Sequence, residues 1–362
     1  MKYFFSSESV TEGHPDKICD IISDRFVDEA ISKDKNSRMA VECTIKDNFI
    51  LIYGEANTHA KIDYEKIAKQ TIKEIGYKED YIVKIKVSNQ SYEISNAVLK
   101  DNDVIGAGDQ GIMFGYACDE TENYMPFPIE YANKLAMQLA TIQKENDMLG
   151  PDGKTQITVE YENNHVKRID SIVISTQHSN LISLEEIKKI IIEQVIDVVI
   201  PSKYIDSFTN YYINPSGSFT IGGSFGDSGT TGRKIVADTY GGFGRIGGGC
   251  LSSKDPTKVD RSAAYYARYV AKNIVANGYA TKCEIQLSYV IGKSNPVSIY
   301  IETFGTNTIA MIELEKKVKD TFNFSLNNII KELDLLRPIY HLTSCYGHFG
   351  KMNLPWEKII NF

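Results

Sequence analysis

Apolar residues recur at helical spacing in several stretches of the chain, and strand-like alternation lies between these stretches. In the first 76 residues the order is helix, hairpin, helix. We predict a helix over 16–32, two strands within 41–56 and a helix over 63–76. The last helix carries both of its end signals, because Asp63 suits the N-cap and Gly76 suits the position just past the end.

The same order recurs twice further along the chain. The second set is predicted as a helix over 129–145, strands over 155–162 and 168–177, and a helix over 184–199 that begins with a capping box of Ser183 and Glu186. The third set is predicted as a helix over 261–277, strands over 283–291 and 297–303, and a helix over 308–321. The hairpins begin at Val41, Thr155 and Cys283, which are 114 and 128 residues apart.

This repetition predicts an α+β fold with a three-fold internal repeat, in which helices cover one face of each sheet. We expect an N-terminal domain at 1–90, a central domain at 109–222 and a C-terminal domain at 223–362. Residues 91–108 are polar and irregular. A long loop of this kind is often an active-site lid or a linker.

Composition narrows the class of protein. The 362 residues are 42% hydrophobic and 24% charged, which is ordinary for a globular protein. No stretch of 18 apolar residues predicts a membrane span, and the first 15 residues do not form a signal peptide. The net charge of −7 disfavours nonspecific binding to nucleic acid. The six cysteines include no C-x-x-C pair, so we expect reduced thiols and a cytoplasmic protein, with no membrane or nucleic-acid partner.

Glycine gathers in one segment, where 12 of the 26 glycines lie within residues 217–249. GAGDQG (106–111) and GFGRIG (242–247) match a dinucleotide-binding pattern, but neither opens a convincing helix. IMFGYA, after the first, alternates like a strand. GDSGTTGRK (226–234) lacks the spacing of a P-loop.

Charged residues lie in and after the glycine-rich segment. They are Arg233, Lys234, Lys254, Lys258 and Arg261, with Asp255 and Asp260 among them. Backbone N–H groups together with several fixed cations suit a polyphosphate. A solvated loop of mixed charge is the simpler interpretation of any one of these lysines, but the whole set beside so many glycines favours anion binding.

The sharpest short motif is EGHPDK, which brings His14, Asp16 and Lys17 together at the start of a predicted helix. A helix N-terminus favours anions. Asp16 suits Mg²⁺, which usually takes one or two carboxylates together with substrate phosphates. Lys17 suits a phosphate, and His14 suits a leaving oxygen. A simpler alternative is a favourable first-turn aspartate beside a surface histidine.

Two glutamates lie on the predicted first hairpin. Val41, Cys43 and Ile45 share one face of a strand, so Glu42 points the other way. Glu55 ends the second strand. Simple alternation, with a solvent-facing carboxylate, explains either residue taken alone.

Taken together, these motifs resemble the S-adenosylmethionine synthetase (methionine adenosyltransferase) family. The matching runs span nearly the whole chain in order: SESVTEGHPDKICD (7–20), GAGDQGIMFGYACDET (106–121), PDGKTQITVEY (151–161), STQHS (175–179), GDSGTTGRKIVADTYGG (226–242), GGGCLSSKDPTKVDRSAAYYARYVAKNIV (247–275) and YGHFG (346–350). The combination of GHPDK, GAGDQG and KDPTKVDRSAAY is highly specific.

The resemblance implies three similar α+β domains around a pseudo-three-fold axis, and a homodimer with active sites between its subunits, often paired into a tetramer. The implied reaction joins ATP and L-methionine. The methionine sulfur attacks ribose C5′, the triphosphate leaves, and it is then split to phosphate and diphosphate. The implied cofactors are two Mg²⁺ per site and K⁺. The stretch 91–102 matches a mobile gating loop that excludes water.

The resemblance also implies roles for individual residues. The implied catalytic residues are His14, Lys154, Arg233 and Lys254. The implied ATP-binding residues are His14, Lys17, Asp109, Asp152, Lys154, Phe219, Asp227, Arg233, Lys234 and Lys254, with Phe219 near the adenine. The implied methionine-binding residues are Glu55, Gln90, Asp227 and Lys258. Asp16 and Asp260 are implied for Mg²⁺, and Glu42 for K⁺.

One departure from the family pattern stands out. Position 218 is Ser where the family usually has Arg, so a cation on the substrate side is missing there or is supplied elsewhere. Two alternatives to an active synthetase exist. A different ATP-dependent transferase would lose Glu55, Gln90 and Asp227, and a non-catalytic regulatory relative that binds ATP would lose His14, Asp16 or the lysine cluster. All of these residues are present.

Overall fold

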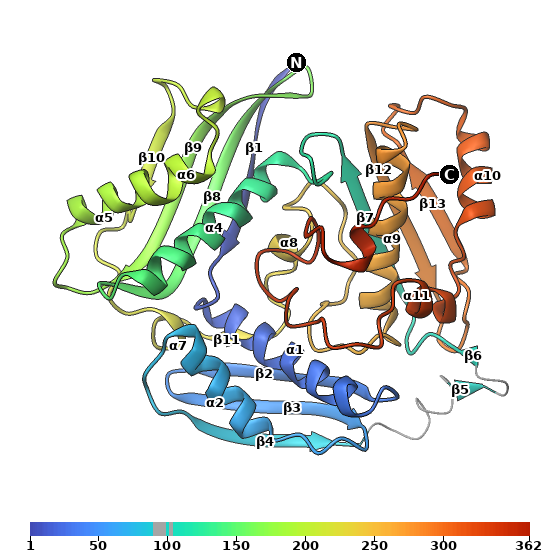
Figure 1. The fold of residues 1–362 in the computed structure, drawn as a ribbon, viewed down its shortest axis with the longest axis horizontal. Helices are drawn as coiled ribbons and strands as arrows, with labels where there is room; N and C mark the ends of the chain where they lie inside the picture. Colours follow the sequence, from blue (N-terminus) through green and yellow to red (C-terminus); the bar gives the residue numbers. More distant parts are fainter. Residues whose placement is uncertain (90–98, 101–103) are drawn as a thin grey trace.

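The computed structural model describes residues 1–89, 99–100 and 104–362. Three units, each a sheet covered by helices, stand around a common centre that loops and the C-terminal segment fill (Figure 1). The expected α+β architecture of three similar units is therefore confirmed. The expected gating segment falls largely on residues outside the described ones.

The first unit contains the elements expected from the first helix–hairpin–helix pattern. They are α1 (Pro15–Lys33), β2 (Arg38–Lys46), β3 (Phe49–Asn57) and α2 (Tyr64–Ile75), followed by β4 (Ile82–Ser88), which the pattern did not predict. The sheet order is β11-β2-β3-β4, where β11 is the two-residue strand Gly229–Thr230. The side chain of Asp63 accepts the N–H of Lys66, and Gly76 has a φ of 121°, so both predicted ends of α2 are confirmed.

The second unit is built on a long hairpin. Its elements are β1 (Lys2–Val10), α4 (Phe127–Glu145), β8 (Leu149–Glu162), β9 (His165–His178), α5 (Leu184–Ile190), α6 (Asp197–Val199) and β10 (Asn210–Ile213). The predicted capping box of Ser183 and Glu186 is present. A π-helical stretch, Ile191–Ile196, separates α5 from α6, so the predicted helix is one helical path with a local change of hydrogen bonding.

The third unit has the sheet order β13-β12-β7. Its elements are β7 (Gly111–Cys118), α9 (Val259–Ala276), β12 (Lys282–Tyr289), β13 (Ser298–Glu302), α10 (Met311–Thr321) and α11 (Leu326–Glu332). The remaining short elements are β5 (Leu99–Lys100), β6 (Val104–Ile105), α7 (Gly223–Gly226), α8 (Ile235–Asp238) and two 3-10 helices, Ser202–Tyr204 and Pro355–Glu357. The strand expected after GAGDQG is β7, and the segment 242–247 forms no helix.

Three strands cross between the ranges expected for the domains. β11, from the C-terminal range, pairs antiparallel with β2 in the first sheet. β1, from the N-terminal range, pairs antiparallel with β8 in the second sheet. β7, from the central range, pairs antiparallel with β12 in the third sheet. Each sheet therefore combines strands from two of the expected ranges, because a strand is placed by the partner whose backbone hydrogen bonds it completes.

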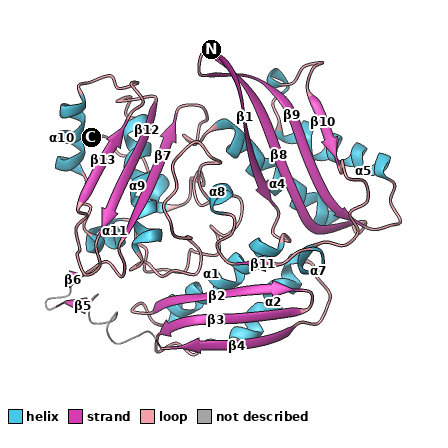
Figure 2. Cartoon of the chain, turned by 180° about the vertical axis from the view of Figure 1, so that it is seen from behind, coloured by secondary structure: helices cyan, strands magenta, loops and turns pink. Residues whose placement is uncertain are grey.

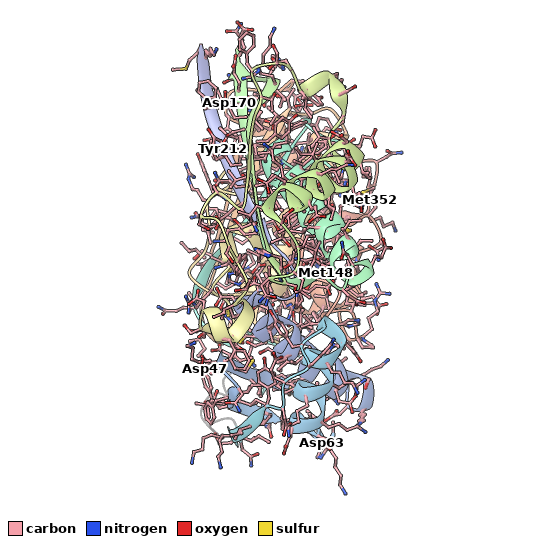
Figure 3. The ribbon with its side chains drawn as sticks, turned by 90° about the vertical axis from the view of Figure 1, so that its left-hand side faces the viewer. Asp47, Asp63, Met148, Asp170, Tyr212 and Met352 are labelled. Atoms are coloured by element: carbon pink, nitrogen blue, oxygen red, sulfur yellow. The ribbon has the colours of Figure 1, made fainter. Side chains whose placement is uncertain are left out.

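The helices lie on one side of the molecule and the sheets face the other (Figure 2). Seen edge-on, Asp47, Asp170 and Tyr212 lie on the sheet side, whereas Met148 and Met352 lie on the helix side (Figure 3). Large apolar side chains are exposed along the outer sheet faces. They include Phe49, Ile82, Ile112, Tyr212 and Tyr300. Among the described residues, no helix combines the length and the apolarity that crossing a membrane requires.

Close backbone contact holds α9 against β7. A Cβ atom on Gly115 of β7 would stand 2.0 Å from the carbonyl carbon of Ala267 on α9. This is far inside van der Waals contact, and the obstacle is backbone that cannot rotate away. Glycine at 115 is therefore a packing requirement of the third unit.

We expect Gly115→Ala to lower the free energy of unfolding by about 3 kcal/mol, because α9 must move away from the sheet. Gly248→Ala is the matched control, since an added Cβ there has nothing within 4 Å. Thermal or denaturant unfolding of both variants measures the difference. Equal stabilities would contradict the packing argument.

Candidate active site

The N-terminus of α1 is built by His14, the N-cap residue. Its Nδ1 accepts the N–H of Asp16 at 3.2 Å, and Pro15 follows at the first helical position, where a missing N–H costs nothing. His14 is 8% exposed. Because Nδ1 accepts a hydrogen bond, the proton of the neutral ring is on Nε2.

Asp16 connects this helix start to the glycine-rich segment. Its Oδ1 accepts the N–H of Thr230 at 3.0 Å, and Nζ of Lys234 donates to its Oδ2 at 2.8 Å. The Nε of Arg233 lies 3.4 Å from Oδ1. Burial works to raise the pKa of Asp16, but the hydrogen bonds from Lys234 and Thr230 outweigh it and lower the pKa. The carboxylate is therefore ionised and available to a cation.

The surroundings of His14 keep its imidazole neutral. Burial, and after it the positive field of Lys234, lower the pKa of His14 to about 3, and Lys154 acts more weakly in the same direction. Asp16 and Asp227 oppose this shift. At neutral pH the ring is thus a hydrogen-bond donor without charge.

The start of β8 supplies the next two residues. Asp152 is 7% exposed, and its Oδ2 accepts the N–H of Gly223 at 2.7 Å. Burial raises the pKa of Asp152 to about 6, against the lowering effect of the Gly223 and Gly153 N–H groups. Lys154 is exposed, and the registers of β8 place it on the outer face of its sheet, opposite Ser175. Asp227 is exposed, and its negative charge contributes to raising the pKa of Asp152.

Lys17 does not lie where the sequence interpretation put it. Its ammonium donates to Oδ2 of Asp20 at 3.0 Å and also contacts Asp238. The residue is 1% exposed, so its charge faces buried carboxylates rather than a bound phosphate. The sequence correctly indicated a motif at a helix start. It could not show which face of α1 each residue takes relative to the rest of the chain.

A second group of charges lies on the first sheet and at the start of α9. Nζ of Lys254 is 2.5 Å from Oδ2 of Asp260. Glu42 on β2 and Glu55 on β3 share the outer sheet face as diagonal neighbours, since Glu42 pairs with Tyr53. Burial and the nearby Glu55 raise the pKa of Glu42, whereas the field of Lys254 lowers it. The predicted outward direction of Glu42 is confirmed.

Strand β2, which lies between β11 and β3, connects the two groups. β11 pairs with β2 at Thr44 and Ile45, beside the residues that hold Asp16. At its other end β2 forms an isolated bridge between Ala40 and Lys254. The five residues from Ala40 to Thr44 span about 13 Å of strand. The two groups of charges, which the sequence presented as one set of cations, therefore flank one strand.

Other predicted residues lie around these groups. Nζ of Lys258, the N-cap residue of α9, donates to the buried Asp255 at 2.9 Å. Phe219 is half-buried, and Asp109 is exposed. Ser218, in the family's arginine position, is exposed and carries no charge. Gln90 lies outside the described residues.

Sequence reasoning missed several residues that support the site. His178 holds Phe219 from both sides, because its Nε2 accepts the N–H of Phe219 at 2.9 Å and its own N–H donates to the Phe219 carbonyl at 3.0 Å. Asp20 and Asp238 were not singled out either. A signal for Asp20 was available: aspartates recur every four residues from Asp16, which places them on one helical face.

The carboxylates fit magnesium of the kind that substrate phosphates help to hold. Within the described ranges, no group of three or more His, Cys, Asp or Glu residues forms a closed metal site. Asp16 and Asp260 are instead single carboxylates, each paired with a lysine. Mg²⁺ bound through one or two carboxylates plus phosphate oxygens suits this arrangement.

The geometry defines a three-unit α+β protein with a neutral histidine and converging cations at a helix N-terminus. Family models of S-adenosylmethionine synthetase cover nearly all of the chain. The N-terminal domain matches residues 2–101, the central domain residues 104–219, and the C-terminal domain residues 221–358. The chain belongs to this family.

Curated relatives agree along the full length. The chain is 50% identical to S-adenosylmethionine synthase of Clostridium botulinum and 50% identical to that of Clostridium tetani, each over 99% of this chain and 97% of the relative. It is 48% identical to S-adenosylmethionine synthase of Sorangium cellulosum, over 99% of this chain and 88% of the relative. These relatives do not favour a regulatory or kinase-like interpretation.

We expect the ring resonances of His14 to show no titration between pH 5 and 8 in an NMR experiment. Between pH 6.5 and about 3 the unfolded chain binds a proton that the folded chain excludes. His14 therefore makes the protein less stable as the pH falls through that interval. Lys234→Met should raise the His14 pKa, because it removes a positive neighbour. A His14 titration near neutral pH in the unaltered protein would contradict this electrostatic account.

Proposed function

We propose that the chain synthesises S-adenosylmethionine from ATP and L-methionine. The methionine sulfur attacks ribose C5′, the triphosphate leaves, and it is then hydrolysed to phosphate and diphosphate. The observation that carries this proposal is the meeting of Lys234, Arg233 and the neutral His14 around Asp16 at the N-terminus of α1. Family membership supports it independently.

The chemistry explains why cations are needed. Displacement at C5′ leaves negative charge on the triphosphate, and preorganised cations stabilise that charge as it develops. Arg233, Lys234, Lys154 and Lys254 are the cations we assign to the phosphates. His14 keeps its proton on Nε2, so it can donate a hydrogen bond to the departing oxygen without itself changing charge.

Magnesium would be held by Asp16 and Asp260, two ions per site, and K⁺ by Glu42. Bound Mg²⁺ supplies charge neutralisation for the phosphates. The lysines now paired with these carboxylates, Lys234 and Lys254, are then free to turn towards phosphate oxygens. The partly buried Glu42 contributes a carboxylate on the sheet face, where a monovalent ion can order the site.

The remaining residues are assigned to the substrates. Asp152, Asp109 and Asp227 line the nucleotide site, and Phe219 lies against the adenine. Glu55, Asp227, Gln90 and Lys258 bind methionine, whose ammonium group suits the carboxylates. Because Lys17 is buried against Asp20 and Asp238, we assign it no direct contact with ATP.

We further propose a homodimer whose active sites lie between subunits, with two dimers pairing into a tetramer in the cytoplasm. Lys154, Glu42 and Glu55 all lie on outer sheet faces, the side without covering helices (Figure 2). Exposed apolar residues such as Ile82 and Tyr212 share these faces. A second copy would bury them and bring its own charged residues to the site. All six cysteines are free, which fits a reducing compartment.

Product analysis tests the reaction itself. With ATP, L-methionine, Mg²⁺ and K⁺, the purified protein should yield S-adenosylmethionine, phosphate and diphosphate, identified by mass spectrometry and chromatography. His14→Asn should lose about 99% of this synthesis, in the range seen when one preorganised donor is removed, and should keep its thermal unfolding temperature. Unchanged turnover of His14→Asn would remove His14 from the mechanism.

Hybrid dimers test the shared site. His14→Asn and Lys254→Met subunits carrying different tags are co-expressed, and the mixed dimer is purified through both tags. Each parent dimer should be inactive. The hybrid should recover about half the wild-type activity, because one of its two sites then combines two unaltered contributions. An inactive hybrid would show that His14 and Lys254 act within one subunit.

A further inference from the structure

Helix α1 carries a buried stripe of four aspartates at four-residue spacing: Asp16, Asp20, Asp24 and Asp28. Residues four apart lie on one face of a helix. These residues are between 0% and 7% exposed. A buried carboxylate is costly unless donors satisfy it, so each must recruit groups from elsewhere in the chain.

The four aspartates accept hydrogen bonds from segments that are distant in sequence. Asp16 accepts the N–H of Thr230, and Asp20 accepts the N–H of Gly232 at 2.8 Å. Further along the helix, Asp24 binds Arg261 through both oxygens at 2.6 and 2.8 Å. At the far end, Asp28 accepts the N–H groups of Tyr340 and His341 at 2.8 and 2.9 Å.

Asp20 lies directly behind the proposed phosphate cations. It holds Gly232, which immediately precedes Arg233 and Lys234. Its other oxygen accepts from Lys17, whose ammonium also contacts Asp238 at the end of α8. The carbonyl of Asp238 in turn accepts the N–H of His348 at 2.8 Å. The segment 232–238 is therefore tied to α1 at both of its ends.

The two cations between these ties have few constraints of their own. The Arg233 side chain is 49% exposed, and its contact with Asp16 is a single one at 3.4 Å. Lys234 has a single side-chain hydrogen bond in the described structure, to a carboxylate that we assign to Mg²⁺. When Asp16 binds Mg²⁺ in place of Lys234, these side-chain contacts are lost. The backbone of Arg233 and Lys234 must therefore be positioned by contacts that do not involve Asp16.

We propose that Asp20, with Lys17 and Asp238, is a buried positioning unit that sets the backbone of Arg233 and Lys234 for the leaving triphosphate. The inference rests on the proposed function for its catalytic consequence, but not for its effect on binding of an inorganic polyphosphate. Asp20 and Lys17 touch no substrate, because both lie beneath the segment. They act through the placement of the two cations.

The test compares Asp20→Asn with Asp28→Asn. Both variants neutralise one aspartate of the same stripe, but Asp28 holds residues 340–341 instead of the cation segment. We expect Asp20→Asn to lower kcat for synthesis about 10- to 100-fold, since small misplacements of catalytic groups cost that much. The KM for methionine should change less than about two-fold, because the methionine contacts are untouched. Asp28→Asn should keep its kcat within about two-fold.

Calorimetric binding of inorganic triphosphate gives a readout that does not need turnover. Asp20→Asn should bind it about ten-fold more weakly, whereas Asp28→Asn should bind it like the unaltered protein. Thermal unfolding of both variants separates general destabilisation from positioning. If Asp20→Asn does not fold, Asp238→Asn is subjected to the same comparison.

The outcomes separate the two proposals. Equal kcat and equal triphosphate affinity for Asp20→Asn and Asp28→Asn would overturn the positioning role. Loss of triphosphate binding in Asp20→Asn alone would support it even if the unaltered protein made no S-adenosylmethionine. Absence of S-adenosylmethionine synthesis by the unaltered protein would instead contradict the proposed function.

Discussion

The buried carboxylates of α1 are the constraint on which much of the structure depends. A charged side chain excluded from water must be met by donors, and here those donors come from segments more than 200 residues away. The glycine-rich segment, the start of α9 and the C-terminal loop are consequently gathered around one helix. The same requirement explains why Lys17, the last residue of the EGHPDK motif, is buried: its ammonium donates to Asp20 and contacts Asp238.

The proposed active site follows from this gathering. Asp16 ends the stripe at the helix N-terminus, where it meets Lys234 and Thr230. Burial and the neighbouring ammonium group lower the pKa of His14 and so keep its ring a neutral donor. The second charged group, around Lys254 and Glu42, lies on a sheet face without covering helices. An open face that carries both charged and apolar residues suits a site completed by another copy.

Much of the secondary structure could be predicted because it depends on short-range patterns. The ends of α2 follow from Asp63 and Gly76, and the capping box of α5 from Ser183 and Glu186. β1, by contrast, was not predicted, since its pairing with β8 joins residues about 150 apart in the chain. The pairing of β7 with β12 in the third sheet is likewise a long-range contact. The local alternation of polar and apolar residues does not specify which distant strand becomes the partner.

The sequence by itself determined the family, the helix–hairpin–helix order and the residue types available for phosphate chemistry. Those features are local or are carried by contiguous motifs. Tertiary structure alone decided the direction of each charge: Lys17 points to Asp20, Asp16 to Lys234, and Glu42 onto the open sheet face. The reason is physical, because the state and orientation of a charged side chain depend on which distant groups desolvate and pair with it.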